Sequence, residues 1–147
     1  MPQYWLKPLG VTEPHAPMPN DWTRDADLDR FDLITGPATH RKPPQMGRGD
    51  LVLFHAVIHV RLFAAAEILD NPQWKRHPVW ELRWPWVYPC RVDVWVPLIE
   101  DGPRTTEIAP KKVIGRLQTG ADFAKLTLPE YEALLDELRA RPTVQDR

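Results

Sequence analysis

The clearest hydrophobic pattern lies in the middle of the chain. Residues 51–60 (LVLFHAVIHV) are dense in branched and aromatic side chains, which predicts a strand that is apolar on both faces. Residues 61–69 (RLFAAAEIL) are ambiguous, because three alanines favour a helix whereas the preceding strand and the following turn favour a hairpin. Residues 90–98 alternate between apolar and polar positions and predict a half-buried strand. Its expected buried face holds Cys90, Val92, Val94, Val96 and Leu98.

The C-terminal segment predicts an amphipathic helix. Thr127 is a suitable N-cap and Glu130 completes a capping box, while Leu126 and Tyr131 occupy the two positions of a hydrophobic staple. Pro142 ends the helix. Its apolar face is expected to hold Tyr131, Leu134, Leu135 and Leu138.

The N-terminal third is less regular. Residues 3–7 predict a short strand that is stopped by Pro8. Residues 25–34 allow a short helical turn, although Leu33 does not fit its apolar face. Three segments rich in loop-forming residues are predicted to be long loops: residues 8–22, 35–50 and 70–87.

Short strands, long loops and few helices favour an α+β fold with an antiparallel, barrel-like sheet. The 147 residues suit a single domain spanning 1–147. No apolar run reaches the length of a membrane span, and the N-terminus does not resemble a secretory signal, so we expect a cytoplasmic protein without a membrane partner.

The charge balance excludes a strongly basic nucleic-acid wrapper, because the net charge is −1. The charges are nevertheless unevenly placed. Residues 39–77 and 111–125 each hold three more basic than acidic side chains, whereas residues 21–32 hold five Asp against two Arg. Two interpretations stay open: solvated loops, or two positive patches that flank an anionic ligand.

The chain offers little support for metal or nucleophilic chemistry. His55 and His59 would lie ~13 Å apart on a strand, too far for joint ligation. The single cysteine, Cys90, falls on the expected apolar face, and no phosphate-binding or nucleophile motif occurs. We therefore expect neither a metal site nor a cofactor, and no catalytic residue is assigned.

Tryptophan and proline are both enriched. There are 7 Trp and 17 Pro, and the Pro content of about 12% compares with a usual value of about 5%. Six of the tryptophans lie in or beside the predicted loops, and their flat rings suit stacking on nucleic-acid bases. Trp22 and Trp86 are ligand candidates on this argument alone. Nearby cations suit phosphates: Arg41, Lys42, Lys75 and Arg76.

Five motifs, in order along nearly the whole chain, resemble those of EVE domains in the PUA-like superfamily. The motifs are YWLKP near the N-terminus, GRGDLVLFHA, AAEILDNP, WVYPCRVDV and LTLPEYEALL. PATHRK is similar to a P-x-x-H-K loop of the shorter members. One departure is Pro8, which stands where the family usually has a polar residue.

The resemblance implies a PUA-like antiparallel pseudo-barrel with surrounding helices and a C-terminal helix. It also implies a reader that binds DNA or RNA and takes a modified base into an aromatic-lined pocket. The residues that it places at this pocket are Trp5, Lys7, His40, Arg41, His55 and Tyr88.

Two other functions remain open on the same fold. One is a small-molecule-binding protein or enzyme that uses His40, His55 or Asp93 as acid or base. The other is a protein-interaction domain that uses the Trp-rich segment 74–86.

Overall fold

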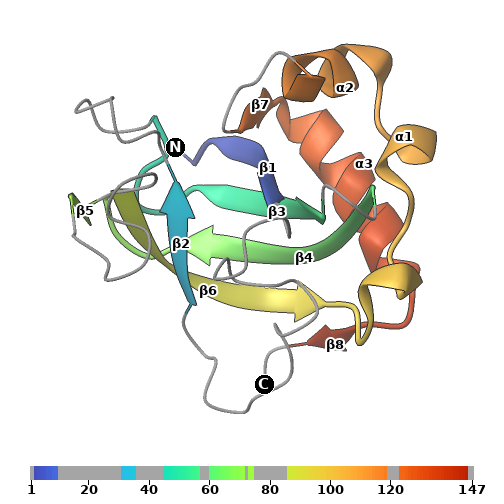
Figure 1. Ribbon diagram of the computed structural model, residues 1–147, viewed down its shortest axis with the longest axis horizontal. Coiled ribbons are helices and arrows are strands. Elements are labelled where there is room, and N and C mark those ends of the chain that lie inside the picture. The colour runs from blue at the N-terminus through green and yellow to red at the C-terminus, as the bar shows by residue number, and fades with distance from the viewer. Residues whose placement is uncertain are drawn as a thin grey trace.

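The computed structural model is an α+β fold in which one mixed sheet is accompanied by helices (Figure 1). The structure describes residues 2–9, 31–35, 45–56, 60–71, 73–74, 86–118 and 123–145. The strands are β1 (Tyr4–Leu9), β2 (Phe31–Thr35), β3 (Leu51–Ala56), β4 (Arg61–Ile68), β5 (Gln73–Trp74), β6 (Trp86–Trp95), β7 (Ala124–Leu126) and β8 (Val144–Gln145). The helices are α1 (Thr105–Ile108), α2 (Lys111–Gln118) and α3 (Leu128–Arg139), with a 3₁₀ turn at Ile99–Asp101.

The main path of the sheet runs β2-β6-β4-β3-β1-β7, and the short strands β5 and β8 both pair with β6. β1 and β3 are parallel, whereas the other strand pairs are antiparallel. The three helices lie together at one side of the sheet (Figure 1). This arrangement is compatible with a pseudo-barrel.

One row of paired residues defines the inner face of the sheet. Trp5 pairs with Val52, Val52 with Ala66 and Ala66 with Val92, so all four side chains point to the same side. Each is at most 3% exposed. The opposite face meets α3, where the rings of Tyr4 and Tyr131 lie 5.0 Å apart. The described buried apolar residues form one core cluster.

Several predicted elements are confirmed. The strand predicted over residues 51–60 is present as β3 from Leu51 to Ala56 and is buried on both faces, whereas Val60 lies in a turn. The alanine-rich segment is the strand β4, because its backbone pairs with β3 on one side and β6 on the other. The α3 capping box is present, and Tyr131, Leu134 and Leu138 are buried.

The prediction that Pro8 ends the first strand is wrong, because β1 continues to Leu9. The amide of Leu51 donates to the carbonyl of Gln3, and in a parallel ladder this directs the odd-numbered amides of β1 towards β3. The nitrogen of Pro8 therefore faces the other side, where β7 pairs with β1 only from Tyr4 to Leu6. Proline is tolerated at that position because no ladder hydrogen bond is lost.

Two further predictions are corrected. The helical turn at 25–34 is wrong for its last residues, because Phe31–Thr35 is a strand paired with β6, as the poor fit of Leu33 to a helical face indicated. The loop at 70–87 contains β5 and the start of β6, so Trp86 lies in a strand, opposite Thr35 and Trp74. Leu98 is 52% exposed, because the strand ends at Trp95.

The sheet is mixed rather than antiparallel. Parallel strands need a long connection, and residues 10–50 provide one between β1 and β3. The longest helix within the described residues has 12 residues, and none of these helices could cross a membrane.

Candidate functional site

The side chain of Asp50 joins three parts of the chain around Trp5. Its Oδ2 accepts hydrogen bonds from the indole Nε1 of Trp5 and from the amide of Gly47, both at 2.9 Å. Its Oδ1 accepts from the amide of Gln3 at 3.0 Å. Asp50 is 4% exposed, so this carboxylate is stabilised by three N–H donors in place of water.

The turn before β3 brings Asp50 to this position. The amide of Asp50 donates to the carbonyl of Gly47, and Gly49 has a φ of 86°. That conformation favours glycine, since other residues meet a steric cost there. The amide of Ile68 donates to the carbonyl of Asp50, which ties the turn to the end of β4. The indole of Trp5 is therefore held by the sheet and by this turn together.

Lys7 lies two residues after Trp5 and on the same face of β1. It is 6% exposed and pairs with Phe54 of β3. A lysine buried to this degree is uncommon in a soluble fold, and its ammonium group can only donate hydrogen bonds. The inner face of the sheet thus places a buried cation beside two aromatic side chains.

Aromatic and cationic groups also cover the indole from β7. Phe123 meets Trp5 edge to face, with ring centroids 5.0 Å apart. Lys125 pairs with Trp5 across the β1–β7 ladder, and its Nζ lies 5.9 Å from the indole centroid. Trp5 is consequently a wall of the inner face and not an exposed stacking platform.

His55 lies on the opposite face of the sheet from Trp5 and Lys7. It pairs with Pro8 of β1, which alternates with Lys7 in direction. Its Nδ1 is 2.6 Å from Oγ1 of the buried Thr105 in α1. Burial lowers the pKa of His55 from 6.5 to about 4, so the imidazole is neutral at pH 7. A neutral histidine engaged by Thr105 is poorly suited to act as a general acid.

The other predicted site residues divide into two groups. Trp22, His40 and Arg41 lie outside the described residues. Trp86 and Tyr88 are described through the backbone of β6, where they occupy the same alternating series of positions as Cys90 and Val92. Among the predicted site residues whose side chains the structure describes, Trp5 and Lys7 share one face of the sheet and His55 lies on the other.

Sequence reasoning missed Asp50 and Phe123. Asp50 resembles an ordinary turn residue after Gly49, and its contact with Trp5 spans 45 positions along the chain. Phe123 is partly buried and lies between Asp122 and Ala124, in a segment for which the sequence analysis predicted no element. The G-D pair directly before a buried strand is the one local signal that could have indicated Asp50.

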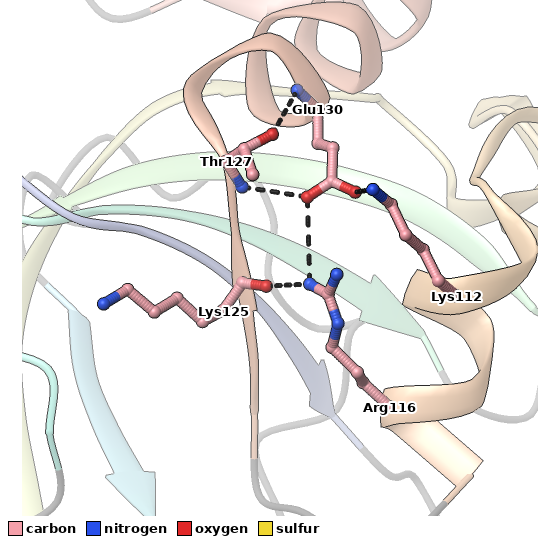
Figure 2. A network of polar contacts seen from close by, with 5 residues as sticks. All are labelled: Lys112, Arg116, Lys125, Thr127 and Glu130. Atoms are coloured by element: carbon pink, nitrogen blue, oxygen red, sulfur yellow. Dashed lines mark hydrogen bonds and ion pairs between the residues drawn. The ribbon is translucent and has the colours of Figure 1, made fainter.

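A second polar group lies where α2, β7 and α3 meet (Figure 2). Glu130 is 8% exposed and accepts from the amide of Thr127 at 2.9 Å. Its carboxylate oxygens lie 3.4 Å from Lys112 Nζ and 3.7 Å from Arg116 Nη1. Burial alone would raise the pKa of Glu130, but the Thr127 amide and the two cations outweigh it and lower the pKa. Arg116 also donates to the carbonyl of Lys125.

Across the residues that the structure describes, no group of three or more His, Cys, Asp or Glu side chains could hold a metal ion.

Comparisons with known proteins show the fold alone. No family model matches the chain, and no curated protein matches its sequence. The structure is similar to that of Rpa0253 from Rhodopseudomonas palustris, with a TM-score of 0.59 and 14% identity over 94% of each chain. It is also similar to a hypothetical protein from Leishmania major, with a TM-score of 0.60 and 16% identity over 95% of this chain and 96% of that one.

Proposed function

We propose that this chain is a nucleic-acid-binding reader with a PUA-like pseudo-barrel of the EVE type. In this function a single base of DNA or RNA, carrying a modification, leaves its stack and enters a pocket on the inner face of the sheet. Three observations support the proposal. The five ordered sequence motifs resemble this family, the mixed sheet is compatible with a pseudo-barrel, and the C-terminal helix has the expected place and cap.

The observation that carries the proposal is that Trp5 and Lys7 lie next to each other on one buried face of β1. An extruded base is recognised by apolar or aromatic walls and by hydrogen bonds to its polar edge. Trp5 and Phe54 supply walls, and the ammonium group of Lys7 supplies a donor for a carbonyl or ring-nitrogen acceptor. Apolar walls also accommodate an added methyl group better than a polar cleft would.

Asp50 acts in this proposal as a positioning residue. It fixes the orientation of the indole through the Nε1 hydrogen bond and does not itself meet the base. A wall held from behind by a buried carboxylate keeps its geometry without the bound ligand, which reduces the ordering cost of binding. The turn that carries Asp50 begins at Gly47, six positions after Arg41 in the sequence.

The test is equilibrium binding to matched single-stranded oligonucleotides of DNA and RNA. One member of each set is unmodified, and the others carry one methylated cytosine or one methylated adenine. We expect a preference for one methylated member that is retained at two salt concentrations, because base contacts depend less on salt than phosphate contacts do. Equal, weak binding to every oligonucleotide would contradict the proposal.

The matched variants are Lys7→Met and Arg48→Met. Lys7→Met keeps most of the aliphatic stem and removes the donor, so it should lower affinity for the preferred oligonucleotide at least tenfold, within the 1–3 kcal/mol of one good base contact. Arg48 forms an exposed ion pair with Asp70 on the outer surface, so Arg48→Met should leave the preference unchanged. Thermal unfolding of both variants checks that the fold is retained.

A further inference from the structure

Three cationic side chains, Lys112, Arg116 and Lys125, gather where α2 meets β7, and the exposed Lys111 precedes them at the start of α2; the four are here called the basic cluster. They are separated by up to 14 positions in the sequence, and the fold joins them by packing α2 against β7. The hydrogen bond from Arg116 to the carbonyl of Lys125 fixes the two elements together. Figure 2 shows three members of the cluster, Lys112, Arg116 and Lys125, around the start of α3.

The cluster is only partly neutralised. Glu130 accepts the ion pairs of Lys112 and Arg116 and is itself buried, while the side chains of these two cations are 66% and 38% exposed. Among the described residues, Lys111 and Lys125 form no ion pair with a carboxylate, and both are exposed. In Figure 2 the side chain of Lys125 points away from Glu130. The surface therefore presents a net positive field.

Helix stability does not explain this placement. Lys111 and Lys112 form the first turn of α2, and that turn holds no acidic residue. Cations at a helix N-terminus oppose the helix dipole, where Asp or Glu would stabilise the helix by about 0.3–1 kcal/mol. The ion pair with Glu130 compensates this cost for Lys112, but Lys111 forms no such ion pair among the described residues. A sequence that breaks a local rule in this way commonly does so at a functional surface.

The basic cluster adjoins the face that carries Trp5. Lys125 pairs with Trp5 across the ladder, and its Nζ lies 5.9 Å from the indole ring. We infer that the basic cluster binds the phosphodiester backbone of a nucleic acid and directs the strand along β7 towards the Trp5–Lys7 face. This inference rests on the proposed function and adds the path of the strand. Exposed lysines spaced over two elements suit successive phosphates, which give affinity without reading sequence.

The test compares the salt dependence of binding for two charge-matched double variants. Lys111→Gln with Lys125→Gln removes the two cations that form no ion pair with a described carboxylate, and leaves the Glu130 contacts in place. Arg139→Gln with Arg141→Gln removes two exposed charges near the C-terminal end of the 12-residue α3, about 18 Å from its N-terminus. The probe is an unmodified single-stranded DNA.

The expected results follow from counterion release. Loss of two phosphate contacts to a single strand lowers the slope of log affinity against log salt by about 1.4. When salt is raised from about 50 to about 200 mM, the factor by which affinity falls should therefore be about seven times smaller for the cluster variant than for the wild type. The α3 variant should keep the wild-type slope. An unchanged slope in the cluster variant would overturn the inference.

The outcomes separate this inference from the proposed function. A reduced slope without any preference for a methylated base supports the basic cluster and contradicts the reader. The protein could instead prefer a methylated oligonucleotide, lose this preference in Lys7→Met and keep the wild-type salt slope in the cluster variant. That result supports the proposed reader and overturns the inference about the basic cluster. Tighter binding of polyglutamate than of the DNA at equal charge would assign the cluster to an acidic protein and also overturn the inference. No binding to any oligonucleotide contradicts both.

Discussion

The indole Nε1 of Trp5 donates to Oδ2 of Asp50 across 2.9 Å, and this hydrogen bond joins the first strand to the turn before β3. Both residues are almost fully buried. A buried carboxylate that loses a donor keeps its desolvation cost, so the contact matters more to stability than an exposed hydrogen bond would. The relationship links the candidate binding face directly to the stability of the fold.

Asp50→Asn should lower the free energy of unfolding by about 2–4 kcal/mol. In either orientation of the Asn amide, its NH2 group would face N–H donors, those of Trp5 and Gly47 or that of Gln3, where the carboxylate now accepts. Urea unfolding of the wild type and variant measures the loss. Asp70→Asn is the matched control, because Asp70 pairs with Arg48 on the exposed surface, and it should cost less than about 1 kcal/mol. Equal losses in the two variants would be inconsistent with the role given to Asp50.

The start of α3 combines a cap with an ion-pair network, and two substitutions separate them. Thr127→Ala removes the side-chain acceptor of the Glu130 amide and should cost about 1 kcal/mol. Glu130→Gln preserves the capping-box geometry but removes the charge that Lys112 and Arg116 face. The decrease in the free energy of unfolding caused by Glu130→Gln should become smaller as salt is raised, whereas the decrease caused by Thr127→Ala should not. Chemical unfolding at low and high salt checks this, and Glu132→Gln at an exposed position is the control. If the free energy lost in Glu130→Gln did not depend on salt, the result would count against the ion-pair network.

His55 should make the protein less stable as the pH decreases. Burial holds its pKa at about 4 in the folded protein against 6.5 ordinarily, so the unfolded chain takes up a proton first as the pH falls. The contribution of His55 is therefore fully present above about pH 6.5, declines towards pH 4 and is constant below it. His55→Asn offers Thr105 a similar polar atom without titrating. Between pH 7 and pH 4.5 the wild type should lose about 2 kcal/mol more than this variant, and parallel losses would refute the assignment.

Val60 has a φ of 55°, in the left-handed region that β-branched residues rarely adopt. Its amide donates to the carbonyl of Ala56 and its carbonyl accepts from Thr105, so the conformation closes the turn between β3 and β4 and meets α1. Val60→Gly should be more stable than Val60→Ala by about 1 kcal/mol, since only glycine relieves the backbone strain. Thermal unfolding of the pair measures the difference. A more stable alanine variant would show that no strain is stored there.

Elements set by local signals could be predicted from the sequence. The capping box of Thr127 and Glu130 needs residues only three apart, and β3 follows from a dense apolar run. The choice of strand for β4 required its neighbours, because three alanines favour a helix until β3 and β6 pair on both sides. Pro8 can remain in β1 because β7 pairs with β1 only as far as Leu6, and no local sequence pattern reveals this.

The candidate site was predictable only in part. The resemblance placed Trp5 and Lys7 at the pocket, and they share one face of β1. It also placed His55 there, and alternation along β3 puts that residue on the opposite face. The contacts that position the site join distant segments, as Asp50 with Trp5 and Lys112 with Glu130 do, and single-sequence periodicity carries no information about such pairs.

The most direct measurement is the indole N–H resonance of Trp5 in a ¹⁵N-labelled sample, assigned by its absence in Trp5→Phe. Titration with the preferred methylated oligonucleotide should shift this resonance, because a base entering the inner face would lie against the ring. The unmodified oligonucleotide should shift it less at equal occupancy. A Trp5 resonance that stays in place while the oligonucleotide binds would contradict recognition of a base on this face.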